Sequence, residues 1–216
     1  MVDITTHRAS PITEHSSSED HLELVEESES SERIKQIVVA SVLASLSIAI
    51  APSASMIARV AGWGIALFDP VSLFWIAAFL IGGYRVGIIS MSAGTLGLFL
   101  YDPTAIGPIF KFAATLPMIL IPLYGVMKLR SEVGGEALSK PKFYTSMMGL
   151  AFIVRLAIML PFNFLYWSLL MPIDGAAFVY ILLVVQSINS VQSLGDAIVP
   201  YLIIHPTGIF KHFGMW

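Results

Sequence analysis

The sequence contains no cysteine and few charged residues. The absence of Cys from the 216 residues excludes disulfides, thiolate metal sites and cysteine nucleophiles. Only 12% of the residues are charged, whereas 56% are hydrophobic, and the mean hydropathy is +0.79. A soluble domain carries about twice that share of charge. The composition therefore indicates a membrane protein, and the net charge of −3 gives no indication of nucleic-acid binding.

The sequence also lacks the short motifs that carry enzymatic chemistry. It has no nucleophile elbow, no glycine-rich phosphate loop, no HExxH zinc motif and no paired carboxylates inside an apolar run. The five histidines lie near the two ends of the chain, at positions 7, 15, 21, 205 and 212. We therefore expect that the chain is not an enzyme, holds no metal or cofactor, and cannot itself use ATP.

Acidic residues are concentrated at the start of the chain. Nine of the fifteen Asp and Glu residues lie in the first 32 positions, among Ser and His and almost no aromatic residues. Such a segment buries too little apolar surface to offset the entropy of ordering, so residues 1–33 are predicted to be a disordered acidic tail. A short acidic helix over 19–32 is the alternative. The segment lacks the basic start and adjacent apolar core of a secretory signal peptide.

The rest of the chain consists of long apolar runs. A helix needs about 20 apolar residues to cross the hydrocarbon core of a bilayer. Breaks at polar, Pro and Gly residues give six candidate spans: 35–51, 69–83, 84–101, 105–128, 143–171 and 176–204. The sequence thus predicts an all-α membrane protein, a six-helix bundle over 34–205 followed by a short tail, 206–216.

The charges between these runs predict how the bundle is oriented. One side would carry Arg33, Lys35, Arg85, Lys128, Arg130, Lys140, Lys142 and Lys211, and the other would carry Arg59, Asp69, Asp102 and Asp174. Because Lys and Arg are retained on the cytoplasmic side, both termini are expected in the cytoplasm. Residues 52–68 leave one alternative open. We interpret them as an outer loop, but as a further span they would give seven helices and an external tail.

Six polar residues are stranded inside the apolar runs: Lys111, Arg155, Asn163, Asn189, Gln192 and Asp196. A charge at the bilayer centre costs roughly 2.5–3.5 kcal/mol on insertion scales, so such residues normally face the interior of a bundle. Arg155 and Asp196 lie at similar depths, which predicts a structural ion pair. Lys111 lies about one turn into its span and either reaches the outer interface or joins a polar site.

The stranded amides are candidates for binding a solute. Asn189 and Gln192 are three residues apart and so share one helix face, and Asn163 lies on the preceding span. Amide groups suit a neutral heterocycle with several donors and acceptors, and Phe110, Phe162, Tyr166 and Trp167 are available for stacking. Bonds between helices are the alternative role for the amides.

The first span carries small residues at regular spacing. Ala40 and Ala44 are four apart, and Ser41 and Ser45 repeat this spacing, which gives a smooth face for close helix packing. Spacing alone favours packing within the chain. Glycines give similar faces at 83–87 and 94–97.

These features together resemble the substrate-binding S component of energy-coupling factor (ECF) vitamin transporters, riboflavin-type members most of all. The resemblance covers about 35–205. It rests on the six-span plan, on Ala40-Ser41-Val42-Leu43-Ala44, on the Gly-Gly-Tyr-Arg-Val-Gly segment 82–87 with the later run 107–117, and on the run 154–163 with Asn189. Riboflavin-type members typically have a lysine three residues after that asparagine, whereas this chain has Gln192.

The resemblance implies a function. A vitamin-like solute, riboflavin as the first candidate, would bind near the outer face of the cell membrane, with Asn163, Asn189, Gln192, Lys111, Phe110 and Tyr166 as candidate contacts. Ala40 and Ala44 would dock a transmembrane coupling subunit, and two ATPase subunits would supply the energy. A membrane sensor or assembly factor, whose inner polar groups only hold helices together, is the alternative.

Overall fold

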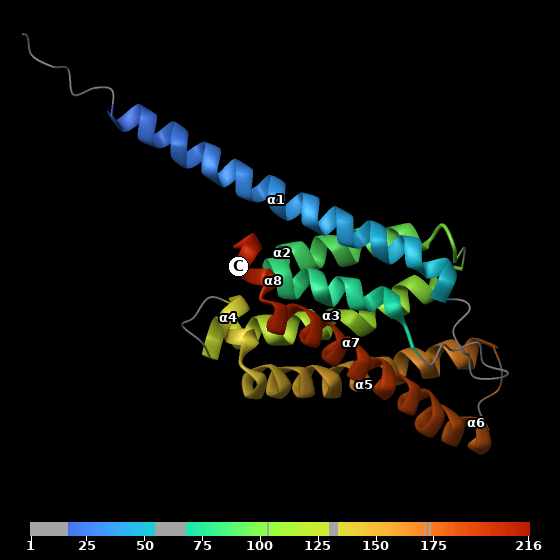
Figure 1. Ribbon diagram of the computed structural model, residues 1–216. Helices are drawn as coiled ribbons and strands as arrows, with labels where there is room; N and C mark the ends of the chain where they lie inside the picture. The colour runs from blue at the N-terminus through green and yellow to red at the C-terminus, as the bar shows by residue number, and fades with distance from the viewer. Residues whose placement is uncertain (1–16, 55–67, 103, 130–133, 171, 173) are drawn as a thin grey trace, which may run out of the picture. The chain divides into compact units, whose positions relative to one another are not determined.

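The structure, a computed structural model, is entirely helical in the part of the chain that it describes, residues 17–54, 68–102, 104–129, 134–170, 172 and 174–216 (Figure 1). Helices make up 91% of it, and no strand occurs among these residues. The chain divides into two compact units, Met1–Lys35 and Gln36–Trp216. The second unit contains the helical bundle.

The first helix, α1, runs over Ser17–Ala54. It corrects the prediction that the acidic tail is disordered up to residue 33, because helix begins at Ser17, before the predicted alternative of 19–32. Glu29 and Arg33, one turn apart, form an exposed ion pair with 3.4 Å between Oε2 and the guanidinium, which supports helix there. Residues 1–16 lie outside the described part of the chain.

The second helix, α2 (Pro70–Leu98), is a tight helical hairpin with its turn at Gly83. Gly83 has φ 78° and ψ −170°, a backbone conformation that strongly favours glycine. A Cβ on Gly87 would lie 2.8 Å from the Phe79 Cβ, and one on Gly94 would run into the Trp75 ring, so the two legs lie side by side. Each leg is roughly 20 Å long at 1.5 Å per residue.

The middle of the bundle consists of α3 (Ile106–Leu129), the short α4 (Gly134–Ser139) and α5 (Pro141–Leu170). Prolines occur inside α3 at 117 and 122 and inside α5 at 161. Membrane helices tolerate them because neighbouring helices and side chains satisfy the freed backbone groups. The bounds of α3 and α5 lie within two residues of the predicted spans 105–128 and 143–171.

The last helices form one nearly continuous rod. It begins with α6 (Gly175–Tyr180), continues through a π-helical turn η1 (Ile181–Val185) and ends with α7 (Gln186–Thr207). Asp174 caps its start by accepting a hydrogen bond from the Ala177 N–H at 2.7 Å. Gly208 in a left-handed conformation separates α7 from α8 (Ile209–Phe213).

The segment 206–216, which was predicted to be a short C-terminal tail, is packed against the bundle. The Trp216 indole N–H donates to the Leu80 carbonyl oxygen at 3.0 Å, and its ring meets the Phe79 ring edge-on at 5.3 Å. Met215 is buried in a cluster with Ala40, Ala78 and Val86. The first leg of α2 ends at the Gly83 turn, and the last carbonyls of a helix need partners from elsewhere, so Trp216 caps this leg.

Five helices are long and apolar enough to cross a membrane, as in a multi-pass membrane protein: Glu29–Ser53, Pro70–Leu98, Ile106–Leu129, Pro141–Leu170 and Gly175–Thr207. The predicted spans 69–83 and 84–101 correspond to the two legs of α2. Of the segment 52–68, which was interpreted as an outer loop or a seventh span, residues 55–67 lie outside the described part of the chain.

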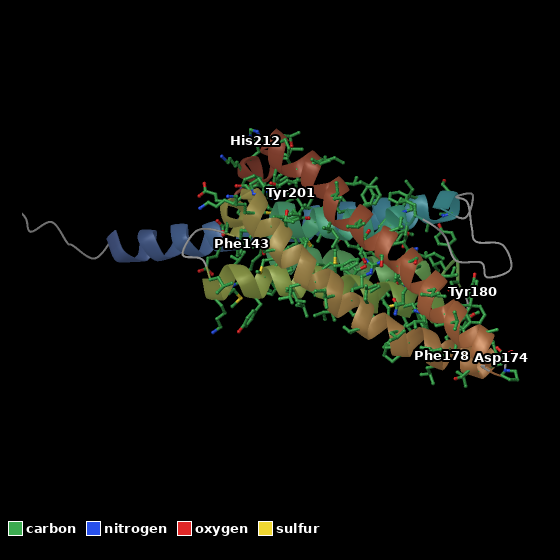
Figure 2. The ribbon with its side chains drawn as sticks, turned by 90° about the horizontal axis from the view of Figure 1, so that it is seen from below. Phe143, Asp174, Phe178, Tyr180, Tyr201 and His212 are labelled. Carbon is green, nitrogen blue, oxygen red and sulfur yellow. The ribbon has the colours of Figure 1, made fainter. Side chains whose placement is uncertain are left out.

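The bundle has two distinct ends. Figure 2 shows Asp174, Phe178 and Tyr180 at one end and Phe143, Tyr201 and His212 at the other. The Gly83 turn, α4 and α8 meet at the second end, where Trp216 contacts Gly83 and Gly134 and Phe210 contacts Gly135. The starts of α2 and α3 lie at the first end.

Candidate functional site

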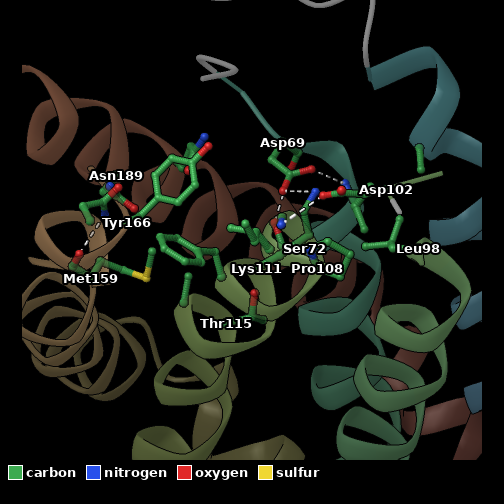
Figure 3. A pocket seen from close by; sticks show the side chains of 18 of the residues that line it. Asp69, Ser72, Leu98, Asp102, Pro108, Lys111, Thr115, Met159, Tyr166 and Asn189 are labelled. Atoms are coloured by element: carbon green, nitrogen blue, oxygen red, sulfur yellow. Dashed lines mark hydrogen bonds and ion pairs between the residues drawn. The ribbon is translucent and has the colours of Figure 1, made fainter. Parts of the chain in front are cut away.

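A cavity of about 760 Å³ lies at the first end of the bundle (Figure 3). The start of α2, the start of α3, the second half of α5 and the junction of η1 with α7 supply most of its wall. This volume falls within the range of about 300–1,000 Å³ that is common for small-molecule pockets. Residues of α3, α5, the η1–α7 junction, both legs of the α2 hairpin and the end of α1 thus line a space large enough for an organic solute.

All six residues predicted to contact a solute line this cavity: Phe110, Lys111, Asn163, Tyr166, Asn189 and Gln192. They come from three helices, two residues from each. The amide pair on α7 is one turn apart, as its spacing predicted, and the pair on α5 has the same spacing. The structure brings the predicted residues together, while their role in binding stays a prediction.

The ion pair expected between Arg155 and Asp196 is present beside the cavity. One guanidinium nitrogen of Arg155 lies 2.5 Å from Oδ2 of Asp196, and the side chains are only 4% and 2% exposed. The Ser72 hydroxyl donates to the other carboxylate oxygen at 2.6 Å. Asp196 therefore joins α2, α5 and α7, and a buried charge pair with these extra bonds is compensated within the protein.

A second ion pair lies nearer the mouth of the cavity, and its acidic partner was not predicted. The Lys111 ammonium lies 2.5 Å from Oδ2 of Asp69, with the two side chains 24% and 15% exposed. Oδ1 of Asp69 also accepts from the Val71 N–H at 3.1 Å and so caps the start of α2. Lys111 is thus held at the cavity by a carboxylate on another helix.

The two asparagines share one local geometry. Nδ2 of Asn163 donates to the Met159 carbonyl at 2.7 Å, and Nδ2 of Asn189 donates to the Val185 carbonyl at 2.9 Å. A carbonyl oxygen only accepts, so these bonds fix which end of each amide is the nitrogen. Both residues are buried and line the cavity, and their Oδ1 atoms remain as acceptors.

Val185 is the last residue of the π-helical turn and itself lines the cavity. π-helical turns are rare in proteins and are frequent at functional sites. Here the turn directly precedes the helix that presents Asn189 and Gln192. A local backbone irregularity therefore adjoins the polar part of the wall.

Aromatic rings, among them those of Phe110, Tyr166 and Trp167, form part of the apolar wall. Phe110 packs edge-on against Phe162 at 5.4 Å and against Tyr166 at 5.8 Å, and Tyr166 packs against Trp167 at 5.3 Å. Phe68 and Met159 also line the space. Aromatic faces next to amide groups suit a flat polar ring, which needs stacking surface and hydrogen bonds together.

Several residues that were not predicted from the sequence also line the cavity, including Asp69, Ser72, Asp102, Thr115 and Met159. Asp69 and Asp102 looked like loop acids, because each stands at the edge of an apolar run. Ser72, Thr115 and Met159 are residue types that occur in most membrane helices. The N-cap position of Asp69, directly before Pro70, was the one available signal that its carboxylate is held in place.

Ala40 and Ala44, which were predicted to dock a partner, lie inside the bundle, and their docking role stays a prediction. The two residues are 0% and 3% exposed, and Ala40 packs against Ala78 and Val86 of α2. Ser47 follows along α1, and its hydroxyl accepts from the Trp75 indole at 3.0 Å. The small residues therefore let α1 approach α2 closely, which is the packing role that their spacing favoured.

No protein-family model, curated protein or solved structure matches this chain. Among the described residues, no group of three or more His, Asp and Glu side chains is placed to hold a metal ion. The class of the protein therefore follows from its own features, namely apolar helices of membrane-spanning length and a cavity at one end of their bundle.

Proposed function

We propose that this chain is the solute-binding subunit of an importer of the ECF type and that it catalyses no covalent step itself. In this proposal six segments cross the cell membrane, with the two legs of the α2 hairpin counted separately. Both termini face the cytoplasm, and the cavity opens toward the outside. A coupling subunit and two ATPases supply the energy for release of the solute.

One observation carries the proposal, namely that a single cavity gathers the six predicted contacts from three helices. Two features of this cavity favour a neutral heterocycle of vitamin size. Aromatic rings line it beside amide groups, and the cations Lys111 and Arg155 are both paired with carboxylates. Riboflavin is the first candidate solute, because its ring system presents a flat face together with carbonyl and N–H groups.

The orientation follows from the charges at the two ends. Lys142 and Lys211 are next in sequence to Phe143 and His212, which lie at the end opposite the cavity in Figure 2, and Arg85 follows the Gly83 turn at the same end. Lys128 lies in the last turn of α3, and all four basic residues are exposed. Asp69 and Asp102 line the cavity, and Asp174 lies at the cavity end. By the positive-inside rule the end with the basic residues faces the cytoplasm. An N-terminal tag that is labelled from outside intact cells would contradict this orientation and favour the seven-helix topology.

The test of the proposed solute is to purify the full chain in detergent and identify any co-purified small molecule by mass spectrometry. Titration with riboflavin follows flavin fluorescence and the quenching of the four tryptophans. We expect saturable binding with one site per chain. A stable, folded protein that yields no bound molecule and quenches with no flavin would contradict riboflavin as the solute.

The network of Ser72, Asp196 and Arg155 supports a second candidate, a membrane sensor or assembly factor. Its hydrogen bonds join three helices, as expected where polar groups only hold a bundle together. The discriminating observation is co-purification of the tagged chain with a coupling subunit and ATPases. Their absence, together with an empty cavity, would favour the sensor.

A further inference from the structure

Two buried donors beside the cavity have no hydrogen-bond partner among the described residues. They are the Thr115 hydroxyl and Nε of Arg155, from residues that are 1% and 3% exposed. Both residues line the cavity, one from α3 and the other from α5. Buried polar groups are normally paired, so an unpaired donor at a cavity wall indicates that something else completes it.

We propose that Arg155 and Thr115 donate hydrogen bonds to an uncharged carbonyl-type oxygen of the solute. This inference rests on the proposed function, because it takes the cavity as the solute site. It gives Arg155 a second role in addition to its ion pair with Asp196. One guanidinium nitrogen bonds the carboxylate, and Nε is left for the ligand.

Among the described residues, two buried hydroxyl residues, Thr115 and Ser90, have no hydrogen-bond partner for the hydroxyl oxygen, and of the two only Thr115 lines the cavity. Inside a helix, a Thr or Ser hydroxyl usually bonds the carbonyl one turn earlier. Thr95 bonds the Met91 carbonyl at 2.8 Å, and Ser193 bonds the Asn189 carbonyl at 2.6 Å. Thr115 makes no such bond, although it is buried to the same degree as Ser193. Its hydroxyl therefore remains unpaired at a residue of the cavity wall.

The charges around the cavity favour a neutral acceptor over a carboxylate. Arg155 is neutralised by Asp196 and Lys111 by Asp69, while Asp102 at the cavity wall accepts from the N–H groups of Thr104 and Gly107. A carboxylate bound there would meet no uncompensated cation and would lose its hydration. A carbonyl oxygen needs only donors. The Asn163 and Asn189 acceptors complement these donors and suit N–H groups of the same solute.

The test compares Thr115→Val with Thr95→Val in the purified full chain. Valine keeps the shape of threonine and removes the hydroxyl. Without solute, we expect Thr115→Val to melt at the same temperature as the wild type or a few degrees higher, because a donor without a partner is removed. Thr95→Val removes a formed bond and is expected to melt lower. A fall for Thr115→Val that equals the fall for Thr95→Val would overturn the proposal.

The binding arm uses two probes, riboflavin and lumichrome, which is the flavin ring system without the ribityl chain. We expect Thr115→Val to lower the affinity for both probes about tenfold, which corresponds to about 1.4 kcal/mol of binding free energy. Thr115→Ser keeps the hydroxyl and is expected to restore the affinity, and Thr95→Val to leave it unchanged. Unchanged affinity of Thr115→Val for both probes would overturn the assignment. Arg155→Lys retains the positive charge but lacks the Nε–H donor. It is expected to lower the affinity for both probes by a similar factor.

These arms separate the inference from the proposed function. If the wild type binds neither probe, riboflavin is refuted as the solute, and the melting comparison still supports or overturns the unpaired donor. If the wild type binds and Thr115→Val binds equally well, the proposed function stands and the donor assignment falls.

Discussion

The two ends of the bundle differ in what fills them. At the cavity end, α2, α3, α5 and α7 line a space of about 760 Å³ with amides, paired charges and aromatic rings. At the opposite end, Trp216, Met215 and Phe210 are packed against the α2 turn and α4. Both ends contain buried polar groups, and at the second end the Trp216 indole satisfies a helix carbonyl.

Because of this difference, we expect substitutions at one end to change mainly stability and substitutions at the other end to change mainly binding. At the end packed by Trp216, Met215 and Phe210, which we call the filled end, removal of a side chain leaves a cavity or an unsatisfied carbonyl. We therefore expect such substitutions to lower the free energy of unfolding. At the cavity end, which we call the hollow end, the lining side chains border an open space, so we expect substitutions there to change binding. The ion pair of Arg155 and Asp196 lies between these cases, because it both borders the cavity and joins helices.

The largest effect is expected from Arg155→Ala. It leaves the buried Asp196 carboxylate without its counter-charge, which costs about 3–5 kcal/mol. Thermal unfolding in detergent measures the loss. The double variant Arg155→Met with Asp196→Leu serves as control and is expected to recover most of the stability while it lacks affinity for riboflavin. A single variant as stable as the wild type would show that the pair does not hold these helices.

Trp216→Ala tests the filled end. It removes the cap of the Leu80 carbonyl and the ring that covers Gly134, and we expect a loss of about 2–4 kcal/mol with riboflavin affinity unchanged. Phe213→Ala is the matched control, since Phe213 is 43% exposed in the same segment. If Trp216→Ala weakened binding and left the melting temperature intact, the division between the two ends would be wrong.

Asn189→Leu tests the hollow end. Leucine has a similar volume but no amide, so we expect about a tenfold loss of riboflavin affinity and a change in stability of less than about 1 kcal/mol. Ser193→Ala lies one turn further along α7 and outside the cavity wall, and it should bind normally. Equal affinity of Asn189→Leu and wild type would remove Asn189 from the site.

The smallest effect is expected from Lys111→Met at the mouth. The ion pair with Asp69 is partly exposed, and such pairs contribute about 0.5–1 kcal/mol. Melting at low and high salt measures it, because screening should reduce the difference between variant and wild type. Lys128→Met, at an exposed lysine near the end of α3, is the control. A loss above about 3 kcal/mol would place Lys111 with the structural pair.

The fold was predictable in outline because apolar runs and their breaks determine membrane helices directly. The Gly82–Gly83 turn was readable from sequence, since only a glycine tolerates the backbone of Gly83. The ion pair of Arg155 and Asp196 was also predictable from the sequence. A charged side chain in an apolar run has a high free energy of insertion, and a partner of opposite charge offsets it. Helix from Ser17 onward was missed, because composition describes solvation and not local helix propensity.

The site was predictable only where residue type alone is unusual for a membrane span. Asn163, Asn189 and Gln192 stand out in apolar runs, whereas Thr115 and Ser72 do not. Asp69 pairs with Lys111 across 42 positions of sequence, and only the packing of α2 against α3 brings them together. The small residues Ala40 and Ala44 could not be assigned from spacing, because a smooth face suits a partner and a neighbouring helix equally well.

The bond between Trp216 and Leu80 also bears on the order of assembly. The donor follows the acceptor by 136 positions, so every helix of the bundle is synthesised before the first leg of α2 receives its cap. Contacts this distant in sequence form late, because the intervening chain must be ordered first. Docking of Trp216 onto the first leg of α2 is therefore expected to follow insertion of the helices, whereas the Gly83 turn joins two adjacent legs and can form before it.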